Sequence, residues 1–306
     1  MRKEDHQPLH FQTISELLRT LGLPKPTHPL IALVDYKDIR VDTGDMEKGY
    51  VLNFYKISFK KQFTGQIRYG QGHYDFEEGG LSFTAPHQRI AATLEERDYS
   101  GYTLLFHPDF IRNYPLGKNI TRYGFFSYAV AEALYLSDKE KKVIFALFDA
   151  IAIELDNNID QFSQDVLVSQ IETLLNYSSR FYNRQFITRK VVHNDLIAEM
   201  ESYLSAFFNR DEALVNGPPT VQQVADQLRV SQRYLSDMLR SLTGQTTQQH
   251  IHARLIEKAK DLLNTGNLTT AEVAYRLGFD YPQSFNKLFK AKTKLSPQEY
   301  RQSFNN

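Results

Sequence analysis

The sequence predicts an α+β protein, with a small N-terminal β-barrel and associated helices followed by an all-α C-terminal region. Three observations support this prediction. Short strand-like segments fill residues 30–107, apolar residues recur at helical spacing from residue 137 onward, and a two-helix pattern occurs twice near the C-terminus. We expect a first domain at 1–208, a linker at 209–219 and a second domain at 220–306.

Five segments have the composition of short strands, rich in β-branched and aromatic residues. Turn signals such as Thr43-Gly44-Asp45 and Glu78-Gly79-Gly80 separate them. Many short strands at close spacing are typical of a small barrel or sandwich. The segments are 30–34, 50–59, 73–76, 80–84 and 102–106.

Helical periodicity begins at Ser137, which with Glu140 has the spacing of a capping box. A second amphipathic segment at 166–181 either packs on the barrel or pairs with a second copy of the chain. A third helix is expected at 195–208, and the Gly217-Pro218-Pro219 run after it cannot continue a helix. These elements place the linker at 209–219.

Composition excludes several classes of site. The chain has no cysteine, which rules out disulfides, thiolate metal sites and a cysteine nucleophile. No apolar run approaches the roughly 20 residues needed to span a bilayer, and the N-terminus lacks the apolar stretch of a secretory signal. We therefore expect an unexported, cytoplasmic protein with no membrane partner.

The net charge of +0 conceals an asymmetry. After residue 219 the chain carries 12 Lys and Arg against 7 Asp and Glu, so the preceding part carries 24 against 29. A basic module joined to an acidic one suggests that the C-terminal part meets a polyanion. Chance segregation of charge is the alternative explanation.

Residues 220–240 and 270–290 repeat one pattern at a spacing of about 50 residues. Each copy predicts a short helix, a tight turn and a second helix at about 231–242 or 281–292, which is a helix-turn-helix unit. One copy alone would be weak evidence, but two together are strong. The matched positions are Val224-Ala225 with Val273-Ala274, Leu228 with Leu277, Leu235 with Phe285, and Leu239 with Phe289.

Residue types around the two turns fit this motif. Ala225 and Ala274 are small where two helices must approach closely. Gly278 suits a left-handed helix end, whereas Arg229 at the equivalent place does not. Good N-capping residues precede both second helices, namely Ser231 and Asp280.

A helix at 251–264 connects the two copies and ends before Gly266. At 1.5 Å per residue it spans roughly 21 Å and forms a rigid spacer. Helices that enter successive major-groove segments on one face of DNA lie about 34 Å apart. A spacer helix with packed ends is compatible with that separation.

The second copy and the tail after it resemble the AraC-type (AraC/XylS) family of bacterial transcription regulators. The resemblance covers about 85 residues and is carried by Glu272–Phe279, Ser284–Lys290 and Leu295–Arg301. It implies a sequence-specific DNA-binding transcription regulator, and it makes the N-terminal region similar to the family's cupin-like sensor and dimerisation domain. RNA polymerase, a small-molecule effector and a second copy of the chain are further partners that the resemblance implies.

Three positions depart from the family pattern. Lys294 stands where the family usually has glycine, and Thr247 stands where the first unit usually has proline. Asp237 occupies the first recognition helix, where a neutral or basic residue is expected. It either accepts from a cytosine amino group or weakens phosphate binding.

We expect eight side chains off the apolar stripes of the two recognition helices to face double-stranded DNA. Arg233 has the fork geometry for a guanine edge, and Arg240 is better placed for phosphate. Gln283 and Asn286 have the amides that pair with adenine. Each residue is otherwise a solvated surface side chain. The full set is Gln232, Arg233, Ser236, Arg240, Gln283, Asn286, Lys287 and Lys290.

Neither a metal nor another cofactor is expected. His73, His87 and His107 fall in the strand region without a close pair, and His250 and His252 point apart on a helix. We therefore expect no catalytic residues and no enzyme. The alternatives are a barrel enzyme with an accessory DNA-binding module and a protein that recruits a partner through its barrel.

Overall fold

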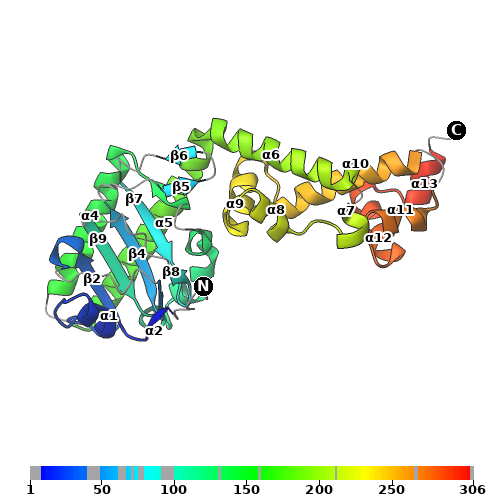
Figure 1. Ribbon diagram of the computed structural model, residues 1–306. Coiled ribbons are helices and arrows are strands. Elements are labelled where there is room, and N and C mark those ends of the chain that lie inside the picture. Colours follow the sequence, from blue (N-terminus) through cyan, green and yellow to red (C-terminus); the bar gives the residue numbers. More distant parts are fainter. Residues whose placement is uncertain are drawn as a thin grey trace, which may run out of the picture. The chain divides into compact units, whose positions relative to one another are not determined.

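The computed structural model of the chain (Figure 1) describes residues 8–39, 49–60, 67–69, 72–74, 79–90, 100–129, 132–157, 160–210, 212–264 and 268–303. It comprises two compact units, Met1–Gln185 and Phe186–Asn306. The first unit contains all the described strands, and the second is helical. The fold is therefore α+β, as predicted.

A five-stranded antiparallel sheet forms the centre of the first unit. Its strands occur in the order β10 (Leu134–Tyr135), β7 (Gly80–Thr84), β4 (Tyr55–Lys60), β9 (Gly101–Phe106) and β2 (Ile31–Asp35). The predicted strands at 30–34, 80–84 and 102–106 are confirmed to within one residue at each end. The predicted strand at 50–59 is interrupted at Asn53 and Phe54 and forms two strands.

The described strands form separate sheets that do not close into one barrel, so the predicted small cupin-like barrel is not confirmed. Strands β1 (Leu9–Phe11), β3 (Tyr50–Leu52) and β8 (Arg89–Ile90) form a separate sheet, and β5 (Ile67–Tyr69) pairs only with β6 (Gly72–Tyr74). The turn signal at residues 43–45 and the acidic pair at residues 77 and 78 lie outside the described residues.

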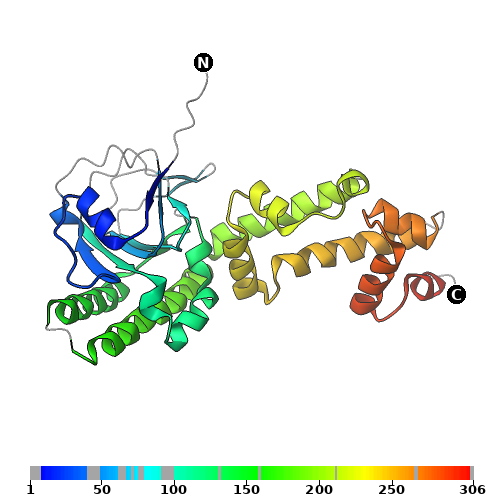
Figure 2. The ribbon, with the colours of Figure 1, turned by 90° about the horizontal axis from the view of Figure 1, so that it is seen from below.

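Helices α4 (Asp138–Asp156) and α5 (Ser163–Thr188) cover one face of the five-stranded sheet (Figure 2). The Phe59 ring of β4 lies 4.7 Å, between centroids, from the Phe145 ring of α4, and Phe83 of β7 lies 6.2 Å from Tyr182 of α5. The predicted Ser137–Glu140 capping box opens α4. Ile171, Leu174, Leu175 and Phe181 of the predicted stripe are buried, which favours packing on the sheet. Pairing of α5 with a second copy stays a prediction.

The opposite face of the sheet packs against helix α1 (Ile14–Thr20). Ala32 and Val34 of β2 and Leu105 of β9 share a core cluster with Leu17 and Leu18 of α1. Two short helices, α2 (Pro108–Ile111) and α3 (Pro115–Asn119), follow β9 and complete the unit.

Eight helices make up the described part of the second unit beyond the end of α5. They are α6 (Lys190–Asn209), α7 (Glu212–Asn216), α8 (Val221–Gln227), α9 (Gln232–Thr243), α10 (Thr247–Asn264), α11 (Thr270–Arg276), α12 (Pro282–Thr293) and α13 (Pro297–Gln302). The spacer helix α10 begins four residues earlier than predicted. The predicted linker contains one short helix, α7, before the Gly-Pro-Pro break.

Helix α6 belongs to the second unit, so the contact boundary precedes the linker that the sequence predicts. Phe207 and Phe208 at its end are buried in a cluster with Leu255 of α10 and with Phe285 and Phe289 of α12. Arg254 of α10 donates to the Ser205 hydroxyl, and Lys258 donates to the Asn209 side chain. These contacts make α6 part of the helical core.

Candidate nucleic-acid interface

The helix pairs α8–α9 and α11–α12 begin in the same way. Thr220 caps α8 in a capping box with Gln223, and Thr269 caps α11 in a capping box with Glu272. Hydrogen bonds from the Thr269 hydroxyl and backbone N–H to Glu272 hold the pKa of that carboxyl below its usual value. The first helix of each pair is therefore fixed by its own sequence.

The turns of the two pairs also have the same hydrogen bonds. The Val230 N–H donates to the Ala225 carbonyl, and the Phe279 N–H donates to the Ala274 carbonyl, each at 3.0 Å. This is the bond that closes a Schellman helix end. Gly278 is left-handed, with φ of 85°, and Arg229 adopts the same conformation, with φ of 56°. The turn geometry thus prevails over the unfavourable residue type at Arg229.

At Gly278 there is also no room for a side chain, a restriction in addition to the left-handed backbone that it shares with Arg229. A Cβ at Gly278 would lie 2.4 Å from the Ala213 carbonyl oxygen and 2.7 Å from Gly217. The segment between α7 and α8 therefore packs directly on the second turn. Only glycine fits this position, for reasons of both space and conformation.

The predicted caps of the second helices have different outcomes. Ser231 accepts from the Tyr234 N–H and caps α9, as expected. Asp280 does not cap α12; the N-cap residue is Tyr281, which makes no side-chain capping bond, and Pro282 takes the first helical position. Proline at that position needs no partner for an N–H, which reduces the need for a cap.

Helix α10 packs against both pairs. Its buried residues include Ile251, Leu255, Ala259 and Leu263, and it contacts α8, α9, α11 and α13. Its 18 residues span about 27 Å at 1.5 Å per residue. The Arg301 guanidinium of α13 donates to the Leu263 carbonyl in the last turn of α10 and to the Leu268 carbonyl just before α11. Both pairs are thus fixed on one rigid helix.

The side chains predicted on α9 are mostly engaged with neighbouring residues. The Arg233 guanidinium lies 2.9 Å from the Asp237 carboxylate, and Gln232 donates to Gln222 of α8. Ser236 is half-buried, and its hydroxyl lies 3.0 Å from the hydroxyl of the buried Thr247. Arg240 is exposed, and it forms no hydrogen bond or ion pair with any described residue.

The side chains predicted on α12 are all exposed: Gln283, Asn286, Lys287 and Lys290. Within the described ranges, none of the four forms a hydrogen bond or an ion pair. The buried residues of the same helix are Phe285 and Phe289, so the four polar side chains lie off its apolar stripe as predicted. Helix α12 therefore presents an open polar face with two lysines.

A buried polar cluster behind α9 was not predicted from the sequence. The His193 ring of α6 bonds to the Phe186 carbonyl through Nδ1 at 2.9 Å and to the Tyr234 hydroxyl of α9 through Nε2 at 3.2 Å. Burial lowers the pKa of His193. The sequence gives no local signal for this cluster, because its residues come from three separate segments.

The described residues contain no group of three or more His, Asp or Glu side chains arranged to hold a metal ion. No helix in the same ranges is both long and apolar enough to cross a membrane.

A family model described as a helix-turn-helix domain matches residues 224–303, which contain most of both pairs and the tail helix. The transcriptional activator RhaS of Escherichia coli K12 is 30% identical over 140 residues, which are 46% of this chain and 46% of RhaS. Residues 224–303 therefore form a helix-turn-helix domain.

Two solved structures are similar to about a third of this chain. The C-terminal domain of AraT, a response regulator of Geobacillus stearothermophilus, is 28% identical with a TM-score of 0.31 and covers 35% of this chain and 84% of that chain. The DNA-binding domain of AdpA, solved with a target DNA, is 27% identical with a TM-score of 0.29 and covers 35% of this chain and 92% of that chain. The match to RhaS spans about half of each protein.

Proposed function

We propose that this protein is a sequence-specific DNA-binding transcription regulator that reads two successive major-groove segments with α9 and α12. The observation that supports it most is the repetition of one helix-turn-helix construction on both ends of α10. A rigid spacer sets the separation of two recognition helices, and DNA offers its major groove at a fixed repeat of about 34 Å. The role places the protein in the cytoplasm, with the chromosome.

The polar faces of the two helices suit different contacts. Gln283 and Asn286 offer amides for adenine edges, and Lys287 and Lys290 offer charge for phosphates. On α9, Arg240 is free for phosphate, whereas Arg233 must leave Asp237 or read DNA together with it. We infer that α12 contributes more of the affinity than α9 does.

The N-terminal unit is proposed to respond to a small molecule. Its support is a set of polar side chains on the sheet face that packs toward α1, where polar groups are costly unless they are satisfied. The Ser58 and Thr103 hydroxyls lie 3.2 Å apart, and Lys56 donates to the Tyr50 hydroxyl at 2.7 Å. A thermal-shift screen of small polar compounds on the wild-type protein and on Thr103→Val tests this role. RNA polymerase and a second copy of the chain stay predictions from the family.

The decisive experiment selects bound sequences from a random duplex pool with purified full-length protein. We expect a motif with two elements about one helical turn apart. In the double variant Gln283→Ala and Lys287→Ala, enrichment of one element should be lost while the other is retained. Lys142→Ala, which removes an exposed lysine from the first unit, is the matched control and should leave both elements unchanged.

Absence of enrichment at low salt with folded protein would contradict the proposal. A motif that survives in the double variant would contradict the role given to α12. The salt dependence of binding provides a further check, because loss of one phosphate contact lowers the slope of log affinity against log salt by about 1.

A further inference from the structure

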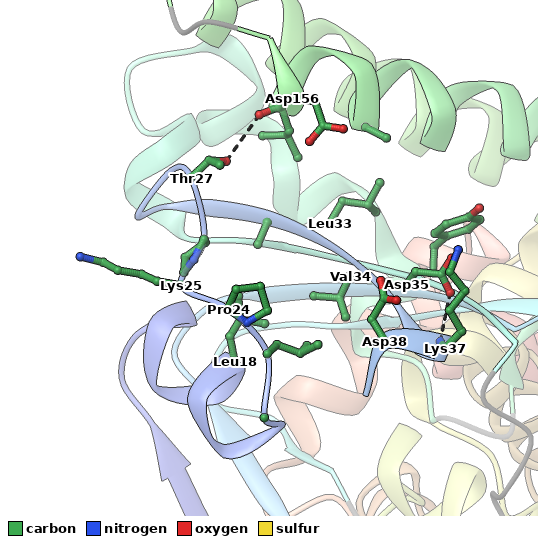
Figure 3. Close-up of a pocket in the computed structure, with 17 residues that line it drawn as sticks. Leu18, Pro24, Lys25, Thr27, Leu33, Val34, Asp35, Lys37, Asp38 and Asp156 are labelled. Carbon is green, nitrogen blue, oxygen red and sulfur yellow. Dashed lines mark hydrogen bonds and ion pairs between the residues drawn. The ribbon is translucent and has the colours of Figure 1, made fainter. Parts of the chain in front are cut away.

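A groove of about 800 Å³ runs along β2 at the edge of the five-stranded sheet in the first unit (Figure 3). One wall is formed by Leu18 of α1 and the loop at 22–27, and the other by Ala152 and Leu155 at the end of α4. The Thr27 hydroxyl donates to the Leu155 carbonyl at 3.5 Å and joins the two walls. The floor is the backbone of β2 itself.

Beyond Ile31, which forms an isolated bridge with His28, the backbone of β2 has hydrogen-bonding groups on this side that no described residue engages. The His107 N–H donates to the Leu30 carbonyl, and the register continues as Ala32 opposite Leu105 and Val34 opposite Thr103. In an antiparallel pair alternate residues bond to the partner. The N–H and C=O of Leu33, and the N–H of Asp35, therefore point away from β9 and into the groove. Among the described strands, none pairs with this edge.

Because this edge is recessed between two walls, a single extended chain can reach it more easily than the edge of a second sheet can. A second sheet, such as the β2 edge of another copy, would bring its own flanking walls and meet α4 and the 22–27 loop before the backbones could pair. A single extended chain has no such walls and fits between them. Side chains along an added strand alternate between its two faces. One face would meet Leu18 and Leu23, and the other would meet Ala152 and Leu155.

Charge distinguishes one end of the groove. Asp35 and Asp38 lie beside Lys37 there, and Lys37 is bound to Asp35 at 2.7 Å (Figure 3). Two carboxylates facing one bound lysine leave an excess negative charge. A basic side chain is the group that this end attracts.

We propose that the groove binds an extended peptide segment of a partner protein, which adds as a strand to β2. The segment has apolar residues at alternate positions and a Lys or Arg at the end nearest Asp38. Main-chain bonds to Leu33 provide affinity, and the two apolar walls and the carboxylates provide selectivity. This inference concerns the first unit and is independent of the DNA-binding role.

The test is selection of peptides from a random heptapeptide library on full-length protein, followed by titration of the selected synthetic peptide. The key variant is Leu33→Pro, which removes the N–H that faces the groove and keeps the ladder bonds to β9, as proline does on edge strands. Leu33→Ala, which loses the side chain but keeps the N–H, is the matched control. We expect at least about tenfold weaker binding in Leu33→Pro than in Leu33→Ala, the loss of one main-chain hydrogen bond.

A second variant does not depend on the proline being tolerated. Asp38→Lys should weaken binding of a peptide with a terminal Lys and have less effect on the same peptide with Gln there. Hydrogen exchange of residues 31–36 should slow when the wild-type protein is mixed with the peptide. Failure to select any peptide, or binding that is equal in Leu33→Pro and Leu33→Ala, would overturn the proposal. Self-association that Leu33→Pro abolishes would show that a second copy is the occupant instead.

Discussion

At the residue scale, the two helix pairs differ in where they place glycine. The turn inside each pair and the end of each second helix require left-handed backbone, and each pair has one glycine there and one longer residue. The first pair has Arg229 with φ of 56° and Gly244 with φ of 74°. The second has Gly278 with φ of 85° and Lys294 with φ of 68°. Both pairs therefore need left-handed backbone at these two positions, but only two of the four positions hold glycine.

Replacing the longer residues with glycine is expected to stabilise the protein. Arg229→Gly and Lys294→Gly should each raise the free energy of unfolding by about 1 kcal/mol, because glycine adopts this conformation without the Cβ clash. Urea denaturation measures the effect. Lys292→Gly, within the last turn of α12, is the control and should lower stability by up to about 1 kcal/mol. Equal losses in all three variants would contradict the strain argument.

His193 links α6 to α9 through the Tyr234 hydroxyl. Because its Nδ1 faces the Phe186 carbonyl, Nδ1 carries the proton and Nε2 accepts from the Tyr234 hydroxyl. Burial is the largest cause of its lowered pKa, and the nearby Arg189 charge acts in the same direction. The hydrogen bond to the Phe186 carbonyl opposes this shift.

This lowered pKa predicts a dependence of stability on pH. Since the unfolded chain binds the proton more readily than the folded one, the contribution of His193 is complete above the ordinary histidine value of about 6.5 and is lost as pH falls below it. The free energy of unfolding should therefore fall less between pH 7.5 and 5.5 in His193→Gln than in the wild type. Identical slopes in the two proteins would exclude a role for His193 in this dependence.

At the scale of elements, α9 and α12 have the same backbone construction but different polar faces. The Asp237 carboxylate binds Arg233, and Gln222 and Thr247 engage Gln232 and Ser236. The corresponding face of α12 makes no such contacts within the described ranges. In the proposed DNA complex, α12 would therefore meet DNA without losing internal contacts, whereas α9 would first have to exchange partners.

Removing the internal carboxylate is expected to strengthen DNA binding through α9. Asp237→Asn frees Arg233 and removes a negative charge from the proposed interface, and we expect several-fold higher affinity with a steeper salt dependence. Fluorescence anisotropy with a selected duplex measures both. Asp149→Asn, an exposed position on α4, is the control for charge alone. A drop in affinity specific to Asp237→Asn would mean that Asp237 reads a cytosine edge itself.

At the scale of the whole molecule, α6 determines where the unit that holds both helix pairs begins. Phe207, Phe208 and Ala213 lie in the same buried cluster as Phe285 and Phe289 of α12. A domain that starts after the linker at 209–219 would leave this surface uncovered. The functional unit is therefore expected to start near Phe186.

Two fragments test this boundary. Residues 186–306 should unfold cooperatively in urea and bind the selected duplex. Residues 220–306 should be less stable by at least about 3 kcal/mol, because the two phenylalanines alone contribute about 1.5 to 3 kcal/mol each when buried. Equal stability of the fragments would restore the boundary that the sequence predicts.

The sequence by itself determined the features that depend on neighbouring residues. A capping box depends on side chains that bond to the backbone three residues away. The helix break at Gly217-Pro218-Pro219 and the repeated helix pairs likewise depend on residues close together in the sequence. For the same reason the outward positions of α12 were predicted by their spacing from Phe285 and Phe289.

Only the tertiary structure decided the features that depend on distant segments. Whether the sheets close, which unit α6 joins and which partners hold Gln232, Arg233 and Ser236 depend on contacts between elements far apart in the chain. The position of β2 at the edge of its sheet also depends on distant segments, because the sequence pattern of residues 31–35 would be the same in an edge strand and in a central strand. Periodicity identifies a buried face but not the element that covers it.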